Sequence, residues 1–539
     1  MLKEKFKFRK RGYRHLTNKL GLLSENEITK LLKKLATPEF IAQYAFLPLI
    51  HIKIEQRRYK KDKNGNRSHK KWNKRKQKYE STAKVRPIHY ATHIDTQLYA
   101  YYAYILKEKY ENILKKNKIL SDSIIAYRYM PIEQENKKPH KKPPGKSTIH
   151  FAKEVFKEIT NRGECIAITL DIENFFSSLS HQYLKKAWIE LLDDRKYVNM
   201  LSPDHYNVYN ATTKFRYIRL DDLRKSHHKK KGFDEKYIAE LKNEGIDAFF
   251  RDGKDFKEKI VQNPNIRTYK NQFKDVKGNS IGIPQGLPIS AVLANIYLLD
   301  FDRQVYNELI EKHGVYYRRY SDDILILCSE KKLKFINKFL QEKIRKCKLK
   351  ISKDKTEIIR FKYNRHNILM SERVGFKEKR LEPELNKNGF PKKIPLKYLG
   401  FEFYGNKTLI KSAGLGKFYR KMKKTIKVKS KRLLYEAQKV PNKKVIFWKR
   451  KIYRRFSFAG HYKKRRKFEE KIIKKVWDEK ENTYILKEDK KTRTLRGNYL
   501  SYAYKASCIM KEPAIRKQVR NHWKILQEEI KKHIDEKHL

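Results

Sequence analysis

The stretch Tyr320-Ser321-Asp322-Asp323 decides the fold that we predict for this chain. It lies between two apolar segments, Val315 to Tyr317 and Ile324 to Leu327, that favour β-structure. Two adjacent carboxylates in such a segment cost stability unless a cation meets them. The stretch therefore predicts a β-hairpin that carries its acidic pair either to a metal ion or into a tight turn.

A second acidic site stands upstream, where Asp171 ends the apolar run Cys165 to Leu170. A short β-prone run of this kind predicts a buried strand with the carboxylate at its tip. We expect the hairpin with Asp322 and Asp323 to be a neighbour of that strand. Three converging carboxylates suit hard divalent cations such as Mg²⁺, and two ions roughly 4 Å apart can hold both oxygens of a phosphoryl transfer. The pattern thus indicates nucleotidyl-transfer chemistry.

A third signal lies between these two acidic sites, in the loop Pro284-Gln285-Gly286. Glycine at the end of this loop allows the backbone to approach a nucleotide closely. Pro288 and Ser290 then start a helix whose apolar positions continue to Leu299. The order along the chain is therefore an acidic strand, a Pro-Gln-Gly loop with its helix, and an acidic hairpin.

With these blocks in this order the chain resembles reverse transcriptases, whose palm carries Tyr-x-Asp-Asp as its signature. The resemblance runs from about Arg86 to about Phe403. It implies an α+β right-hand polymerase, with fingers and palm of antiparallel sheet plus helices and an α-helical thumb and C-terminal region. We expect an N-terminal region with fingers at residues 1–150, a palm at 151–405 with a fingers insertion at about 206–280, and a helical thumb with a C-terminal extension at 406–539.

The resemblance also implies a set of functional residues. The catalytic carboxylates would be Asp171, Asp322 and Asp323, which together with Ile172 would bind two Mg²⁺ ions, or Mn²⁺ in their place. The residues that would contact the incoming dNTP are Lys84, Arg86, Phe176, Gln285, Gly286 and Lys355. Those that would contact primer or template are Tyr320, Tyr398, Leu399 and Gly400.

Physical chemistry supports some of these implied roles and leaves others open. The charge of a triphosphate needs ammonium or guanidinium partners in any mechanism, which suits Lys84 and Arg86. The bulky ring of Phe176 would exclude a 2′-hydroxyl, so dNTPs are the expected substrates. Two positions depart from many relatives, Ser177 in place of Asp and Ser321 in place of Ala. Neither supplies a required metal ligand, so the catalytic core is expected to be intact.

The charge of the chain predicts a polyanionic partner. The 539 residues carry a formal net charge of +69, with a pI near 10.0. Such a chain would otherwise repel itself, so we expect a nucleic acid as its partner, and the resemblance to reverse transcriptases implies an RNA template and a DNA product. Simple solvation of lysine-rich surfaces is the competing explanation for any single basic run.

Cysteine content and hydropathy exclude several other classes of protein. The four cysteines are scattered without zinc spacing, so neither a structural zinc nor a disulfide framework is expected. The N-terminal segment Met1 to Phe6 is charged, and no uninterrupted apolar span reaches membrane length. We therefore expect a cytoplasmic protein without a membrane partner.

The C-terminal region changes character after Phe403. Helical spacing is predicted for residues 419–434, 445–458 and 468–477, followed by 496–510 and a terminal helix that ends near Ile534. The basic faces of these helices are either solvated or grip a template-primer duplex or structured RNA through its phosphates. We favour the second interpretation.

The finer assignment among bacterial reverse transcriptases rests on what the sequence contains. The retron blocks Asn-Ala-x-x-His and Val-Thr-Gly and the Cys/His cluster of an intron endonuclease are not found. Pro288 to Leu293, with Ala291 where intron enzymes commonly have Pro, resembles the defence-associated and abortive-infection group. This likeness implies an anti-phage role, often with a noncoding RNA template and sometimes with homo-oligomers.

Several alternatives stay open at this stage. One is a group II intron or retron-type reverse transcriptase, and another is an inactive, basic RNA-binding scaffold. An RNA-dependent RNA polymerase is a further alternative, which Phe176 disfavours. Some members of the defence group prime DNA synthesis from a tyrosine hydroxyl, and no priming residue is assigned.

Overall fold

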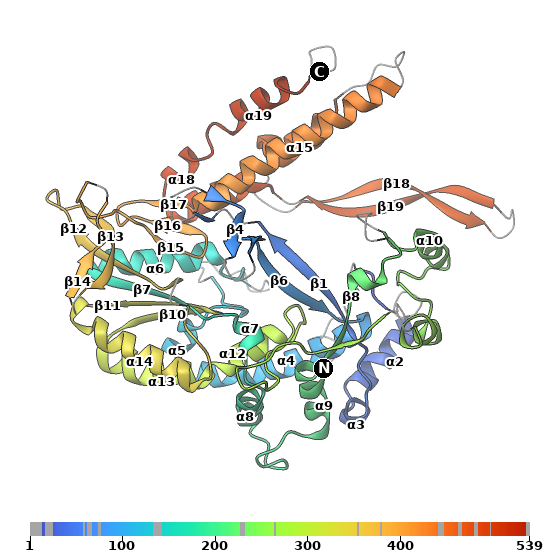
Figure 1. The fold of residues 1–539 in the computed structure, drawn as a ribbon, viewed down its shortest axis with the longest axis horizontal. Helices are drawn as coiled ribbons and strands as arrows, with labels where there is room; N and C mark the ends of the chain where they lie inside the picture. The colour runs from blue at the N-terminus through green and yellow to red at the C-terminus, as the bar shows by residue number, and fades with distance from the viewer. Residues whose placement is uncertain are drawn as a thin grey trace. The chain divides into compact units, whose positions relative to one another are not determined.

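The structure is a computed structural model of the chain. It describes residues 13–16, 25–57, 60–61, 67–73, 77–132, 143–226, 232–263, 266–352, 355–377, 380–386, 388–439, 447–461, 466–478, 483–495 and 497–534. The chain divides into two compact units that alternate along the sequence (Figure 1). Unit 1 comprises residues 1–127, 170–324 and 334–355, and unit 2 comprises residues 128–169, 325–333 and 356–539. The predicted boundaries at 150 and 405 remain predictions.

Unit 1 contains most of the helices that surround the acidic strand tips. Its helices are α2 (Glu25–Leu35), α3 (Pro38–Ala42), α4 (His93–Lys115), α5 (Lys118–Ser123), α7 (Phe175–Ser178), α8 (His181–Leu192), α9 (Pro203–Thr213), α10 (Glu235–Asn243), α11 (Gly253–Phe256), α12 (Ser290–Tyr297), α13 (Leu299–Val305) and α14 (Leu333–Lys346), whose first residue belongs to unit 2. Short 3-10 or π-helical turns are η2 (Leu220–Leu223), η3 (Lys257–Val261) and η4 (Tyr306–Glu311).

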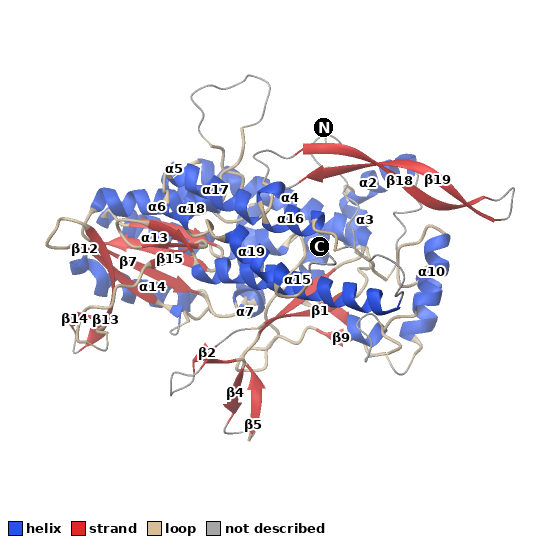
Figure 2. Cartoon of the chain, turned by 90° about the horizontal axis from the view of Figure 1, so that it is seen from above, coloured by secondary structure: helices blue, strands red, loops and turns tan. Residues whose placement is uncertain are grey.

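The first sheet of unit 1 has the strand order β6-β1-β8-β9. Its strands are β1 (Leu49–Gln56), β6 (Lys84–Tyr90), β8 (Arg216–Arg219) and β9 (Tyr269–Lys270). The start of β1 is apolar and buried, whereas its end is exposed, because Ile50 packs with Ile218 and Phe250 in one core cluster. Two short hairpins, β2 (Lys60–Lys61) with β3 (Arg67–Ser68) and β4 (Lys70–Asn73) with β5 (Lys78–Ser81), extend unit 1 (Figure 2). The dipeptide Asn64-Gly65 predicts a hairpin turn, and it lies outside the described residues.

Local capping explains where two helices of unit 1 begin. The Ser180 hydroxyl accepts a hydrogen bond from the Tyr183 amide at the start of α8, and serine is one of the residues preferred at this cap position. Thr92 caps α4 in the same way through the Asp95 amide. These two caps fix the first turns of helices that contact each other and α12.

The largest sheet carries the two acidic segments. Its order is β10-β11-β7-β12-β13-β14, and β7 (Cys165–Asp171) and β11 (Asp323–Cys328) run through the boundary between the units. The remaining strands are β10 (Tyr316–Tyr320), β12 (Glu357–Tyr363), β13 (Leu369–Lys377) and β14 (Arg380–Pro383). Strand β7 is almost wholly buried, as its apolar run predicts for a central strand.

Unit 2 combines a small sheet with long helices. Its strands β15 (Leu396–Tyr398), β16 (Phe401–Phe403) and β17 (Thr408–Ile410) form a three-stranded sheet. The helices are α6 (Thr148–Arg162), α15 (Ser412–Lys439), α16 (Arg450–Phe456), α17 (Tyr499–Met510), α18 (Ala514–Lys517) and α19 (His522–Lys531), with 3-10 turns η5 (Glu330–Lys332) and η7 (Phe458–Gly460). Among the described residues, no helix is both long and apolar enough to cross a bilayer.

One predicted helix of the C-terminal region is wrong. Residues 468–477 lie in strand β18 (Arg466–Asp478), which pairs along its whole length with β19 (Thr483–Leu495) as a two-stranded ribbon (Figures 1 and 2). The spacing of Phe468, Ile472 and Val476 is helical, but Tyr484-Ile485-Leu486 is a strongly β-prone partner segment. Pairing with that later segment outweighs the local periodicity.

Candidate active site

The acidic hairpin forms as the sequence predicts. Strand β10 ends at Tyr320, β11 begins at Asp323, and Ser321 and Asp322 make the turn between them. Ser321 has a φ of 61°, a conformation that two-residue hairpin turns require and that usually selects glycine. The turn therefore holds a buried serine in a costly conformation directly before Asp322.

Backbone hydrogen bonds bring Asp171 and Asp322 together within unit 1. The Ile172 amide donates to the Asp322 carbonyl oxygen at 3.2 Å. On the other side, the Ser352 amide donates to the Asp171 carbonyl oxygen at 2.8 Å. The tip of β7 is thus held between the hairpin turn and the segment before Lys355, and its carboxylate adjoins that of Asp322.

Four charged side chains converge at this point. The pKa of Asp322 is raised above its ordinary value, chiefly because the carboxyl is buried and further because of the negative charge of Asp171. Lys84 and Lys355 act in the opposite direction on the same pKa. The Lys355 ammonium forms an ion pair and hydrogen bond with Asp171 Oδ2. The Lys355 ammonium thus places a positive charge beside the Asp171 carboxylate, a position that would also attract a metal ion.

Asp323 does not join this pair in a three-carboxylate group. Among the residues that the structure describes, no three His, Cys, Asp or Glu side chains gather in an arrangement that could hold a metal ion. Asp323 is exposed at the start of β11, where successive side chains point to opposite faces. Its negative charge nevertheless contributes, after burial and Tyr127, to the raised pKa of Tyr320.

The Pro-Gln-Gly loop packs directly against the strand that carries Lys84 and Arg86. The His89 amide of β6 donates to the Gln285 carbonyl oxygen at 2.9 Å. A Cβ at Gly286, whose φ is +128°, would lie 2.3 Å from the His89 carbonyl oxygen. Only glycine fits there, so the sequence signal at Gly286 reflects a close approach of two backbones within the protein.

Phe176 is tied to the same loop from the other direction. The Ile283 amide donates to the Phe176 carbonyl oxygen at 2.8 Å, and the Gly282 amide donates to the Leu179 carbonyl oxygen at 2.7 Å. Gly282 also permits a close approach, since a Cβ there would lie 2.6 Å from the Ser177 carbonyl oxygen. Short helix α7 with Phe176 and the Gln285 loop therefore form one hydrogen-bonded assembly.

The structure places the other predicted residues on two different units. Arg86 lies on β6 of unit 1, opposite Ile54 of β1. Tyr320 ends β10, and its ring centre lies 6.5 Å from that of Tyr127. Tyr398, Leu399 and Gly400 belong to unit 2, where they form the turn from β15 to β16 and where Leu399 and Gly400 have φ values of 42° and 93°.

The sequence did not predict a buried ionic cluster that is hydrogen-bonded to the hairpin turn. Arg319 of β10 and Asp302 of α13 have fully buried side chains that pair at 2.6 Å. The Arg319 guanidinium also donates to Asn295 Oδ1 at 3.2 Å and to the Ser321 carbonyl oxygen at 3.3 Å. Burial alone would lower the pKa of Arg319, but its interactions with Asp302 raise that pKa instead. The cluster thus joins two helices to the turn that presents Asp322.

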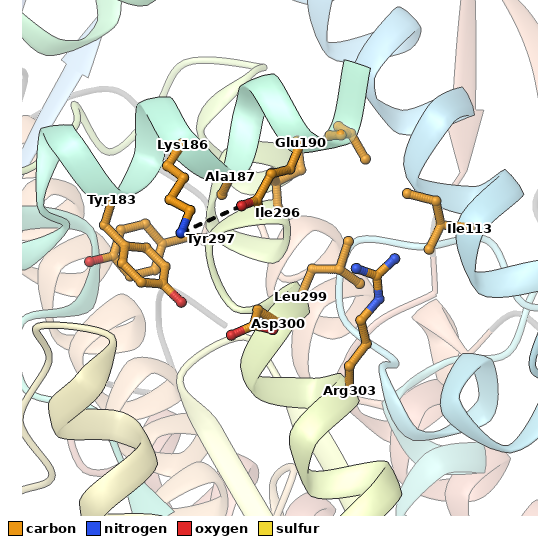
Figure 3. A pocket seen from close by; sticks show the side chains of 11 residues that line it. Ile113, Tyr183, Lys186, Ala187, Glu190, Ile296, Tyr297, Leu299, Asp300 and Arg303 are labelled. Atoms are coloured by element: carbon orange, nitrogen blue, oxygen red, sulfur yellow. Dashed lines mark ion pairs between the residues drawn. The ribbon is translucent and has the colours of Figure 1, made fainter. Parts of the chain in front are cut away.

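A small cavity of unit 1, of about 180 Å³, has a different lining (Figure 3). It includes Tyr183, Lys186 and Glu190 of α8 and Asp300 and Arg303 of α13, none of which is a predicted functional residue. Lys186 pairs with Glu190 at 3.8 Å, shown as the dashed line in Figure 3. The two cationic side chains of the cavity, Lys186 and Arg303, are balanced by the carboxylates of Glu190 and Asp300. This cavity therefore does not have the excess positive charge that a triphosphate site needs.

Comparison with protein families supports the interpretation of these blocks. Residues 231–403 match the sequence profile of the family described as reverse transcriptase (RNA-dependent DNA polymerase). The matched residues include the Gln285 loop, Asp322, Asp323 and Lys355, but not Lys84, Asp171 or Phe176. Residues 231–403 are therefore similar to a reverse transcriptase domain, and the mixed helix-and-sheet structure agrees with the predicted α+β class.

Solved structures similar to this chain include telomerases. Apo telomerase from Candida tropicalis, truncated from its C-terminal domain, has 11% identity and a TM-score of 0.35, with 62% of this chain and 53% of that chain covered. Telomerase from Candida albicans, in complex with the TWJ fragment of telomeric RNA, has 11% identity and a TM-score of 0.32, with 73% and 52% covered. The chain thus spans about half the length of these structures. No curated protein matches the chain in sequence.

Proposed function

We propose that this protein is an RNA-directed DNA polymerase that adds deoxynucleotides to a primer 3′-hydroxyl. The observation that carries the proposal is the meeting of Asp171 and Asp322 at one point of unit 1, with Lys84 and Lys355 acting on the same carboxyl. The match of residues 231–403 to the reverse transcriptase family supports the choice of reaction.

The residues at this point fit divalent cations. The negative charge of Asp171 contributes to the raised pKa of Asp322, so this point is a favourable environment for a positive ion, and hard oxygen ligands suit Mg²⁺ or Mn²⁺. Asp171 and Asp322 are the residues proposed to hold such ions, with Ile172 as a further ligand, whereas Asp323 lies outside this pair. When bound, the ions would lower the pKa of the attacking hydroxyl and stabilise the leaving pyrophosphate.

The remaining residues of the assembly would position the nucleotide. Lys84 and Arg86 are proposed to contact the triphosphate, because both lie on β6, whose His89 amide bonds to the Gln285 loop. Lys355 keeps the Asp171 carboxylate paired in the absence of substrate. The ring of Phe176 is proposed to lie against the sugar and to exclude a 2′-hydroxyl.

Finer aspects of the proposal rest on sequence likeness. We propose that the template is a structured noncoding RNA and that the protein acts in bacterial anti-phage defence, because Pro288 to Leu293 resembles that group. Tyr320 and Tyr398 to Gly400 are proposed to contact primer or template. The net charge of +69 supports a nucleic-acid partner, whatever its sequence.

A paired set of variants tests the proposed reaction. Asp322→Asn with Asp323→Asn should lower dNTP incorporation on a primed RNA template in Mg²⁺ by about a thousandfold or more, because ions worth about 4 kcal/mol to the transition state are lost. The control is Asp193→Asn with Asp194→Asn, which removes the same charge from another adjacent pair. Asp193 has a left-handed backbone that asparagine tolerates.

Comparison of the two double variants tests whether Asp322 and Asp323 belong to the active site. Retained RNA binding and an unchanged melting temperature in both double variants would show that only the chemistry differs. Near-normal incorporation by Asp322→Asn with Asp323→Asn would refute the proposed active site. Loss of incorporation in the Asp193 and Asp194 control would show that charge alone, and not this carboxylate pair, governs activity.

A further inference from the structure

Unit 2 contains a cavity of about 590 Å³ that shares no residue with the proposed active site. It is lined by residues from β12, β13 and the loop that follows β14. Its volume falls within the roughly 300–1,000 Å³ of pockets that hold small organic ligands or groups of similar size. The chemistry of its lining indicates which kind of group it would take.

Two large aromatic side chains of the cavity are exposed to water. Phe390 is 67% exposed and Tyr363 is 44% exposed. Aromatic surface left in water is unfavourable by about 25 cal/mol per Å², so two such rings in one cavity indicate a surface that a partner covers. Nucleobases are flat, and they stack on aromatic rings without regard to sequence.

Local contacts fix the backbone of Phe390 and the ring of Tyr363. The side chain of Asn386 accepts a hydrogen bond from the Phe390 amide at 3.1 Å, and the Asn386 amide donates to the Phe390 carbonyl oxygen at 2.8 Å. The Tyr363 ring packs over Gly163, where an added Cβ would lie 3.1 Å from its hydroxyl oxygen. The Phe390 backbone and the Tyr363 ring are therefore preorganised, which lowers the entropic cost of stacking a base at this cavity.

Three lysines line the same cavity, and they carry more positive charge than their partners neutralise. Lys362 lies 3.4 Å from Glu372, a carboxylate that pairs more closely, at 2.6 Å, with Arg360. Lys392 lies 3.9 Å from Glu384. Lys393 makes no ion pair with any residue that the structure describes. The cavity thus suits an anion next to a flat apolar group.

A buried polar group also faces this cavity. The Ser371 side chain lines it, the residue is only 1% exposed, and its hydroxyl has no hydrogen-bond partner among the described residues. A buried hydroxyl without a partner costs roughly 1–3 kcal/mol. An occupant with hydrogen-bonding edges, such as a nucleobase, would remove that cost.

We propose that this cavity binds a segment of single-stranded nucleic acid, with bases on Tyr363 and Phe390 and phosphates on the three lysines. The residues that bind this segment would be different from those that carry the proposed chemistry. A peptide could cover the rings, but the unneutralised lysines favour a polyanion. The inference does not depend on polymerase activity, because none of its residues belongs to the proposed active site.

Photocrosslinking of the full chain to a single-stranded oligoribonucleotide that contains 4-thiouridine tests the proposal. Mass spectrometry should find crosslinks at Lys392 and Lys393. Tyr363→Ala with Phe390→Ala should lower the yield at those lysines by about tenfold or more, because base stacking is lost while both lysines remain. The matched control is Phe376→Ala, an aromatic residue of β13 that is 40% exposed and does not line the cavity.

Two further measurements separate this proposal from the polymerase assignment. The variant Tyr363→Ala with Phe390→Ala should extend a primed template at the normal rate, and Asp322→Asn with Asp323→Asn should retain the crosslinks at Lys392 and Lys393. Crosslinks found only in other parts of the chain would overturn the proposal. So would a yield at Lys392 and Lys393 that is equal in the double variant and the Phe376→Ala control.

Discussion

Replacing Arg319 by Met should both destabilise unit 1 and displace the acidic turn. The substitution leaves the Asp302 carboxylate fully buried, and among the described residues the Tyr317 hydroxyl, at 2.6 Å, is its remaining hydrogen-bond donor. Removing one partner of a buried ion pair costs about 3–5 kcal/mol. A loss of that size should lower the melting temperature by about 5–10 °C.

The second consequence of the substitution is geometric. The bond of 3.3 Å from the Arg319 guanidinium to the Ser321 carbonyl oxygen is lost, and Ser321 already has a left-handed backbone. A misplacement of about 1 Å in a catalytic group can lower the rate by about a hundredfold. We therefore expect single-turnover dNTP incorporation by Arg319→Met to fall by one to two orders of magnitude at a temperature where the variant remains folded.

A double variant separates the two effects. Arg319→Met with Asp302→Leu removes both charges, and apolar replacement of a buried ion pair is often neutral or stabilising. Its melting temperature should therefore return close to that of the unmodified protein, whereas incorporation should remain low because the Ser321 bond is still absent. Full recovery of incorporation in the double variant would refute the positioning role. A melting temperature unchanged in Arg319→Met would refute the energetic argument.

Three further predictions concern residues of unit 1, namely two buried histidines, Gly286 and Phe176. Burial lowers the pKa of both His15 and His89 to about 3, so these neutral side chains contribute stability above pH 6.5 that is lost as the pH falls. At pH 5 the loss is about 2 kcal/mol for each, which hydrogen exchange of β1 and β6 should detect, and unchanged protection would contradict it. Gly286→Ala should abolish dNTP incorporation without reducing RNA binding, because the added Cβ would lie 2.3 Å from the His89 carbonyl oxygen. Normal primer extension by this variant would disprove the prediction. Phe176→Ala should raise use of ribonucleotides relative to dNTPs by about 10–100-fold in single-nucleotide extension, and an unchanged ratio would exclude Phe176 as the sugar-selecting residue.

The features that could be predicted from the sequence are those set by short local patterns. The apolar run before Asp171 predicts a buried strand with a terminal carboxylate, and Ser180 predicts a helix cap, because neighbouring residues decide both. The hairpin around Asp322 is likewise encoded by its own two β-prone flanks. Order along the chain then indicates which of these elements meet.

The features that could not be predicted depend on partners distant in sequence. Arg319 is one of 130 lysines and arginines, and only its packing against Asp302 makes it a buried ion pair. Strand β18 has helical spacing, and its pairing with β19 decides its structure. The contact of Lys355 with the triphosphate stays a prediction, and the ion pair that Lys355 forms with Asp171 could not be predicted because it depends on the position of β7.

Mn²⁺ binding followed by electron paramagnetic resonance tests most directly whether Asp171 and Asp322 share a divalent ion. The full chain should bind Mn²⁺ in a form that Mg²⁺ displaces, and Asp171→Asn and Asp322→Asn should each weaken that binding by at least about tenfold, since carboxylates are the preferred ligands of hard cations. The variant Asp193→Asn should bind as the unmodified chain does. Equal Mn²⁺ binding by all four proteins would contradict the account.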